Sequence, residues 1–432
     1  MTWSKTLGVS LAAASLVGIS QTNGFQGQFR ESSYSVETKR AQKATELVER
    51  WMKVSGTPGA TVAVSVDGRL VYSQGFGLAD VENSSKCHSN SVMRIASISK
   101  PVTATIAAKL VDNGALDLEK SIYEYLPDFP KKKWDGKEVD ITVRQLLGHR
   151  GGIRHYDKNP ETSPDEPHPK TIDELYQSYN EKEPKYEFLL RKRFENTTEA
   201  LELFKNDDLI KKPGDFSYTT HGFALLAACL EKASGKSFKK LASELFTDLG
   251  MNSTCLDVND KIISNRARYY RRNRKHELVN VPEVDVSYKH AGGGILSTSQ
   301  DLLKLANVAL ASSLGVPGAY LTQSTMKEFL NEKYRTDDYK HFYALGWMVT
   351  PDTKQVSGTK QNQTGYFYHT GAATGCSSLV LFKPTTLSST KPPAGPKGVC
   401  VTILANCQEV YDDITKLGEE LVNVFVAESG DL

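Results

Sequence analysis

One feature narrows the possible folds of this chain more than any other. Ser97 and Lys100 lie three residues apart, where a helix is predicted to begin. A spacing of three places both side chains on one face of a helix. Pro101 fits a first turn whose amide hydrogens lack helical partners, and Gly114 provides a stop. Apolar residues recur at a spacing of four between them: Val102, Ile106 and Leu110. The pattern predicts a helix that begins near Ser97.

A serine hydroxyl is a poor nucleophile at neutral pH and needs a base within hydrogen-bond reach. A partly desolvated lysine with a lowered pKa can be that base. Free amides at a helix N-terminus can also hold a developing anion. An N-cap serine followed by a solvated lysine is the ordinary alternative, because such pairs arise by chance. The rest of the chain must decide between the two interpretations.

Composition indicates an ordinary globular protein. The chain has 432 residues, of which 39% are hydrophobic and 24% charged, and this suits one large α/β unit with insertions. A net charge of +2 gives no reason to expect nucleic acid or an acidic membrane surface as the main partner. The short basic runs are interpreted as solvated faces.

No metal or cofactor is predicted. None of the nine histidines forms His-x-x-x-His, and the six cysteines lack the close pairs of a zinc site. The even number of cysteines permits disulfides without requiring them, so the redox compartment stays open.

The N-terminus carries a short apolar segment from Leu7 to Ile19, preceded by Lys5. It is too short for a comfortable membrane span and fits a removable leader. Residues 1–40 are therefore interpreted as a targeting segment and linker, and any membrane contact would come only through them. Secretion is the alternative to mitochondrial delivery, since four glycosylation sequons begin at Asn83, Asn196, Asn252 and Asn362.

Alternating strands and capped helices follow the leader. A helix is predicted over Gln42 to Val54, then a hairpin of Ala60 to Val66 and Arg69 to Ser73 around Asp67-Gly68. A capped helix stopped by glycines is predicted over 141–153. Ser299 is the predicted cap of an amphipathic helix. Two adjacent strands, 378–382 and 399–406, precede a final helix over 410–427.

These residues together resemble the class C β-lactamase and penicillin-binding-protein family. The resemblance rests on the hairpin, on Val92-Met-Arg-Ile-Ala-Ser-Ile-Ser-Lys100, on Ile141-Thr-Val-Arg-Gln-Leu-Leu-Gly-His149 and on Gly152-Ile-Arg-His-Tyr156. It covers roughly residues 41–427, and the animal mitochondrial members of the family are the most similar. It implies an α/β fold with an antiparallel sheet, flanked by N- and C-terminal helices and joined to a mainly helical subdomain.

The resemblance assigns a second catalytic stretch to Tyr218-Thr219-Thr220. In the family a tyrosine here shares the proton transfers of the nucleophile. Thr220 stands where class C β-lactamases have asparagine, which puts binding of a β-lactam side chain in doubt.

The third stretch is His369-Thr370-Gly371, where the family has Lys-Thr-Gly or His-Thr-Gly on an edge strand. By resemblance, the His369 side chain is cationic or donates a hydrogen bond and orients the substrate and the tyrosine. Gly371 lets the substrate approach the strand, and the amide of Ala372 completes an oxyanion hole.

A charged, proline-containing insertion spans about 157–213. Its first part, to about Pro184, is predicted to be exposed, and Thr198 to Ile210 has a helical spacing. A solvated surface loop is one interpretation. A contact surface for self-assembly is the other, because the mitochondrial relatives form filaments.

The function predicted is that of an active-site-serine hydrolase that forms an acyl-enzyme at Ser97. The resemblance favours a peptide over an ester substrate, the mitochondrial intermembrane space as location, and an influence on lipid metabolism. A scaffold that acts by assembly into homo-oligomers or filaments is the alternative.

Overall fold

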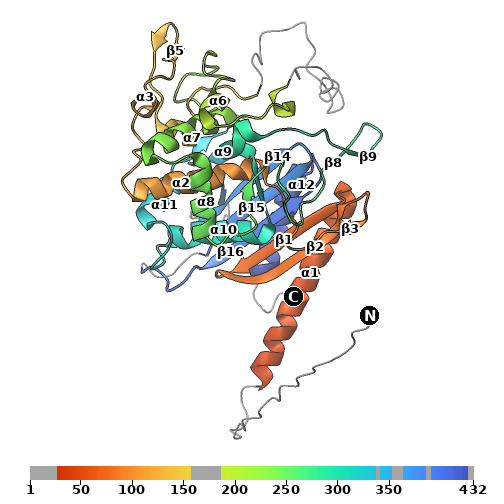
Figure 1. Ribbon diagram of the computed structural model, residues 1–432. Helices are drawn as coiled ribbons and strands as arrows, with labels where there is room; N and C mark the ends of the chain where they lie inside the picture. Colours follow the sequence, from red (N-terminus) through yellow and green to blue (C-terminus); the bar gives the residue numbers. More distant parts are fainter. Residues whose placement is uncertain (1–26, 157–185, 337–340, 353–362, 386–390, 427–432) are drawn as a thin grey trace, which may run out of the picture.

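A large antiparallel sheet forms the centre of the computed structural model (Figure 1). The structure describes residues 27–156, 186–336, 341–352, 363–385 and 391–426, so the predicted leader and the first part of the insertion lie outside it. Among the described residues, nine strands lie in the order β11 (Tyr334–Arg335), β12 (Phe342–Tyr343), β13 (Met348–Asp352), β14 (Gln363–Ala373), β15 (Cys376–Pro384), β16 (Gly398–Ala405), β1 (Gly59–Val66), β2 (Arg69–Asp80) and β3 (Ser85–Lys86).

The sheet is built from both ends of the chain. β1 pairs with β16 in a register that sets Ala60 opposite Ala405, and β16 pairs in turn with β15. Between β1 and β2, Asp67 and Gly68 have φ of 51° and 77°, which a tight hairpin with matching twist requires. The predicted hairpin and the predicted pair of C-terminal strands are both confirmed.

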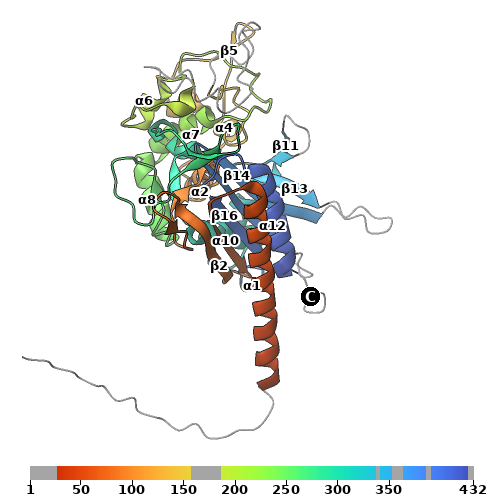
Figure 2. The same ribbon diagram turned by 90° about the vertical axis from the view of Figure 1, so that its right-hand side faces the viewer.

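Helices cover both faces of the sheet. α1 (Gly27–Ser55) and α12 (Tyr411–Val426) lie side by side on one face (Figure 2). Ala44 and Val48 of α1 and Leu417 and Leu421 of α12 join one apolar core with the sheet. α10 (Ser299–Leu314) packs on the other face. In the part of the chain that the structure describes, no helix is both long enough and apolar enough to cross a membrane.

The predicted helical subdomain is present beside the sheet (Figure 1). Its helices are α2 (Ser99–Asp112), α3 (Ile122–Tyr125), α4 (Val143–Leu147), α6 (Thr197–Leu201), α7 (Thr220–Ser234), α8 (Phe238–Asp248), α9 (His290–Gly293) and α11 (Gln323–Asn331), with the 3-10 turns η1 (Ala96–Ile98), η3 (Glu187–Leu189) and η4 (Ser287–Lys289). Short pairings complete it: β4 (Met93–Arg94) with β10 (Ile295–Ser297) and β7 (Cys255–Leu256), β5 (Lys133–Trp134) with β6 (Lys137–Glu138), and β8 (Tyr270–Arg272) with β9 (Leu278–Asn280).

Several predicted boundaries were wrong by one residue or more. The cap of α10 is Thr298, whose hydroxyl accepts from the Asp301 amide, while Ser299 is the first helical residue. The helix predicted over 141–153 is the short α4, which begins after a Thr142 cap and ends before Gly148. Residue 40, the predicted end of the leader and linker, falls inside α1.

The second half of the insertion is not a solvated loop. Leu189, Phe194, Phe204 and Leu209 are buried, and they pack against the helical subdomain or in small clusters beside it. Helical structure within 198–210 is limited to α6, and turns follow it. The charged composition misled the prediction because the apolar residues are few, although most of them are buried or half-buried.

Candidate active site

Ser97 lies in the η1 turn, at the entrance to α2. Ala96 before it is buried and has φ of 47°, a left-handed conformation that is strained for any residue except glycine. Hydrogen bonds hold the turn from both sides: Ser378 Oγ donates to Ile95 O at 2.8 Å, and Ile95 N donates to Ile295 O at 3.0 Å. The turn leaves Ser97 partly exposed between buried neighbours.

Lys100 is fully buried in the first turn of α2, and its ammonium group faces Ser97. Lys100 Nζ lies 3.0 Å from Ser97 Oγ, 3.3 Å from Thr220 Oγ1 and 2.8 Å from Gly292 O. Burial, and after it the charge of Lys289, lowers the pKa of Lys100 well below its ordinary value. The alternative of a solvated lysine is therefore wrong.

Tyr218 lies over the same lysine, with Lys100 Nζ 4.7 Å from the centre of its ring. Burial raises the pKa of the Tyr218 phenol, and a hydrogen bond with Ser97 opposes part of the rise. The ring is held by His149, whose ring centre lies 4.3 Å away. Thr220 is buried, and its hydroxyl faces Lys100 rather than open solvent.

Strand β14 brings the third predicted stretch against the η1 turn. A Cβ on Gly371 would lie 2.4 Å from Ile95 O and 2.2 Å from Ser378 Oγ, so only glycine allows this approach. Thr370 is half-buried and Ala372 is exposed beside it. His369 is buried, and its ring centre lies 6.4 Å from that of Tyr218. The structure thus gathers all three predicted stretches around Ser97.

Comparison with known proteins identifies the family. The beta-lactamase family model matches residues 44–421. The chain belongs to the beta-lactamase family. Its relative from Mus musculus, serine beta-lactamase-like protein LACTB, mitochondrial, is 38% identical over 88% of this chain and 79% of its own length. The chain is therefore a serine beta-lactamase-like member of a hydrolase family, and this relative is named as mitochondrial.

Solved structures of the family share the fold. The octameric penicillin-binding protein homologue from Pyrococcus abyssi superposes with a TM-score of 0.65 at 21% identity, over 89% of this chain and 77% of that one. A class C beta-lactamase superposes with a TM-score of 0.65 at 20% identity, over 91% and 98% of the two chains. The predicted fold class is confirmed.

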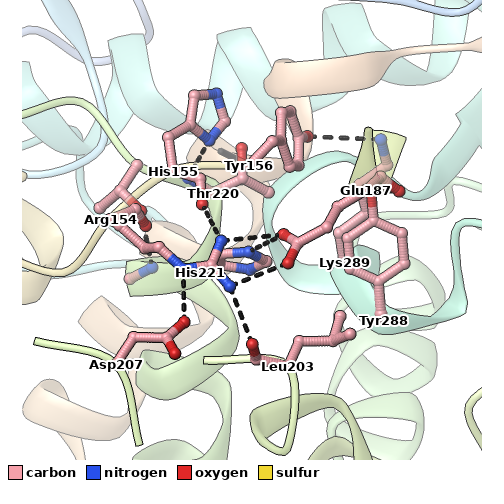
Figure 3. Close-up of polar contacts among 12 residues, drawn as sticks. Arg154, His155, Tyr156, Glu187, Leu203, Asp207, Thr220, His221, Tyr288 and Lys289 are labelled. Atoms are coloured by element: carbon pink, nitrogen blue, oxygen red, sulfur yellow. Dashed lines mark hydrogen bonds and ion pairs between the residues drawn. The ribbon is translucent and has the colours of Figure 1, made fainter. Parts of the chain in front are cut away.

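A polar network around Arg154 and Glu187 reaches His221 at the start of α7 (Figure 3). The Arg154 guanidinium forms two hydrogen bonds to the Glu187 carboxylate, at 2.8 and 3.0 Å, and a third to Asp207 Oδ2 at 2.6 Å. Glu187 Oε2 also lies 2.7 Å from His221 Nε2. Glu187 therefore joins the η3 turn to the first turn of α7, which carries Thr220.

The loop before the insertion is also joined to the start of α7, through one backbone carbonyl and one side chain. Thr219 Oγ1 donates to Arg154 O at 2.5 Å, and Thr220 N donates to His155 Nδ1 at 3.3 Å. His155 in turn stacks on Tyr156, with ring centres 3.9 Å apart. These contacts fix the turn that delivers Tyr218 and Thr220 to Lys100.

Replacing Glu187 with glutamine should lower the free energy of unfolding at pH 7 by about 3 to 5 kcal/mol, because it leaves the buried Arg154 charge without its main partner. Burial raises the pKa of Glu187, but hydrogen bonds from His221 and Arg154 outweigh it and hold the pKa below its ordinary value. The stabilisation is therefore fully present above the ordinary pKa of a glutamate and is lost as the pH falls through the folded-state pKa.

Urea unfolding of both proteins at several pH values measures this effect. Glu195→Gln is the matched control, because Glu195 lies on the same segment but is exposed, and it should change stability by less than about 0.5 kcal/mol. Equal stability of Glu187→Gln and the natural protein at neutral pH would contradict the interpretation of Glu187 as a stabilising partner of the buried Arg154 charge.

The described residues contain no group of three or more histidine, cysteine, aspartate or glutamate side chains arranged to hold a metal ion. All six cysteines are free thiols, five of them buried. Burial raises the pKa of Cys229 and Cys400, so these thiols behave as small apolar core residues.

Sequence reasoning missed four side chains that shape the site. His149 packs on the Tyr218 ring, and Tyr343 contacts His369. Lys289 lowers the Lys100 pKa, and Glu187 contacts His221 on α7. His149 belongs to a stretch used for the family resemblance, but no role was predicted for it. Tyr343, Lys289 and Glu187 belong to no motif, because their partners lie far away in the sequence.

Proposed function

We propose that this protein is a serine hydrolase that forms an acyl-enzyme at Ser97. The observation that carries the proposal is the buried Lys100 amine 3.0 Å from Ser97 Oγ. No carboxylate of the described residues forms an ion pair with this amine, and the low pKa keeps a share of it neutral. A neutral amine at this distance can accept the hydroxyl proton.

Acylation then proceeds by balanced proton transfers. Ser97 Oγ forms a bond to the substrate carbonyl carbon while its proton passes to Lys100 Nζ. The amides of Ser97 and Ala372 hold the oxyanion that develops. The bond between the carbonyl carbon and the leaving group then breaks as the leaving group takes a proton from the Tyr218 phenol, whose raised pKa keeps it protonated in the free enzyme. Lys100 returns its proton to Tyr218. Attack by water on the ester at Ser97 reverses these transfers and releases the acid.

A peptide is the proposed substrate, on the strength of the family resemblance. The purified protein should cleave peptide amides from a positional peptide library, and Ser97→Ala should not. Esters with the same acyl groups are the comparison, because the acyl-enzyme route serves both. Cleavage of the esters alone would replace the peptidase assignment with an esterase, and cleavage of neither, with no reaction towards serine-directed probes, would leave only a scaffold role.

The proposal extends to location and assembly. The leader-like segment and the name of the mouse relative support delivery to mitochondria. The intermembrane space is proposed from the family resemblance alone. Self-association is proposed because the Pyrococcus abyssi homologue is octameric. Glycans on the native protein would contradict the mitochondrial location, and a monomer at every accessible concentration would contradict self-association.

Replacing Lys289 with methionine should move the acid limb of the rate of Ser97 acylation to higher pH. Lys289 is buried and lies 3.3 Å from the Tyr156 hydroxyl, and among the described residues it is the charged side chain that lowers the Lys100 pKa. Without its charge the Lys100 pKa rises, so a larger share of the amine is protonated at pH 7 and acylation slows. This expectation is tested by measuring the rate of Ser97 labelling as a function of pH.

Lys289→Arg is the matched control, because it keeps the positive charge and should leave the limb near its natural position. A limb that moves to lower pH in Lys289→Met, or that moves equally in both variants, would show that Lys289 does not tune the base.

A further inference from the structure

His369 is enclosed on β14, and both of its ring nitrogens already have partners. His369 Nδ1 lies 2.6 Å from Thr370 O, and Nε2 lies 3.1 Å from the Tyr343 hydroxyl. The ring is buried, and Tyr343 is fully buried against it with the two ring planes at 90°. Every polar atom of the imidazole is therefore used inside the protein.

The chemistry of these partners fixes where the imidazole proton lies. A carbonyl oxygen can only accept, so the proton is on Nδ1. A neutral imidazole then has a bare lone pair on Nε2, and the phenol must donate to it. The pKa values agree with this arrangement. Burial, and then the charge of Lys100, lowers the pKa of His369 to about 3, and burial raises that of Tyr343 well above its ordinary value.

We propose that Tyr343 is a positioning residue that holds His369 as the neutral tautomer protonated on Nδ1, so that β14 presents neither a cation nor an imidazole proton donor to the substrate. This proposal rests on the proposed function only in taking the space beside β14 as the substrate site. It replaces the expectation that the His369 side chain is cationic or donates to the substrate, and it confines proton transfer to Ser97, Lys100 and Tyr218.

The hydrogen bond with the Thr370 carbonyl raises the His369 pKa, but burial and the charge of Lys100 outweigh it and favour the neutral form. Lys100 faces the imidazole from α2, Tyr218 from the turn before α7, Tyr343 from β12, and His149 from the loop after α4. Among the residues that the structure describes, no acidic group is one of the charges that act on its pKa. A second cation at this place would therefore meet only Lys100 and neutral rings, which is why a protonated imidazole is disfavoured.

Nitrogen NMR of protein labelled with ¹⁵N-histidine tests the assignment, with His369→Gln used to identify the His369 signals. In the natural protein at pH 7 we expect a protonated Nδ1 and an unprotonated, hydrogen-bonded Nε2. In Tyr343→Phe the lone pair loses its donor, so the His369 titration should move upward by about one pH unit. Tyr288→Phe is the matched control, because Tyr288 is an equally buried tyrosine that donates to Glu187 O, and it should leave His369 unchanged.

Three results would overturn the proposal: a cationic His369 at pH 7, a proton on Nε2, or an unchanged titration in Tyr343→Phe. The spectrum of the natural protein decides the tautomer even if Tyr343→Phe does not fold. The measurement needs no turnover, so it also stands apart from the proposed function. A confirmed tautomer with no Ser97 labelling would reject the hydrolase alone, whereas Ser97 labelling with a cationic His369 would reject this assignment alone.

Discussion

Replacing Ser97 with alanine should abolish covalent labelling by a fluorophosphonate probe and leave the fold nearly unchanged. Ser97 combines partial exposure, a strained preceding residue and a lysine amine 3.0 Å from its oxygen. Its hydroxyl contacts Lys100 and Tyr218 rather than the apolar core, so its loss should have little effect on stability. Labelling followed by mass spectrometry of the tagged peptide measures the reaction, and circular dichroism checks the fold.

Ser99→Ala is the matched control for this experiment. Ser99 is the first residue of α2, two residues after Ser97, but its side chain is buried and its hydroxyl has no partner among the described residues. The control variant should label at the natural rate. A tagged peptide that still appears in Ser97→Ala would place the nucleophile elsewhere.

Replacing Lys100 with alanine should slow acylation of Ser97 by about 10²- to 10⁴-fold, because general-base help of this kind supplies about 3 to 5 kcal/mol of the barrier. Lys100→Arg should fail similarly, since a guanidinium stays protonated and cannot accept the hydroxyl proton. Tyr218→Phe should also slow the reaction. Because the groups act as one unit, the double variant should lose less than the sum of the two effects.

The first-order rate of probe labelling measures these losses, with Lys109→Ala as the matched control. Lys109 lies on the same helix, but its amine donates to the Tyr320 carbonyl away from Ser97. If Lys100→Ala is labelled as fast as the natural protein, Lys100 is not the base. Fully additive losses in the double variant would show that Lys100 and Tyr218 act independently.

Residues that act through local spacing could be predicted from the sequence. Ser97 and Lys100 meet because a helical start sets their distance, and Asp67-Gly68 specifies its hairpin by its own backbone preferences. The position of the α10 cap could not be fixed, because Thr298 and Ser299 both carry a hydroxyl and only the backbone conformation separates them.

Residues that act through distant partners could not be predicted. The Glu187 carboxylate acts through hydrogen bonds with Arg154 and His221, and Tyr343 acts through its hydrogen bond with His369. No local pattern marks such pairs, because the fold alone brings them together. The burial of Phe204 was hidden in the same way by the charged residues around it.

The pairing of β1 with β16 also governs when the molecule can acquire its structure. On the ribosome, the first hairpin emerges long before β16, so one edge of β1 stays unpaired until nearly the whole chain has been synthesised. Contacts between such distant residues close slowly. The nucleophile turn receives its support from Ser378 of β15 and from β10, so it too remains incomplete until these late segments arrive. A nascent chain consequently cannot complete the turn at Ser97, and it stays exposed to chaperones and aggregation, until its last strand docks.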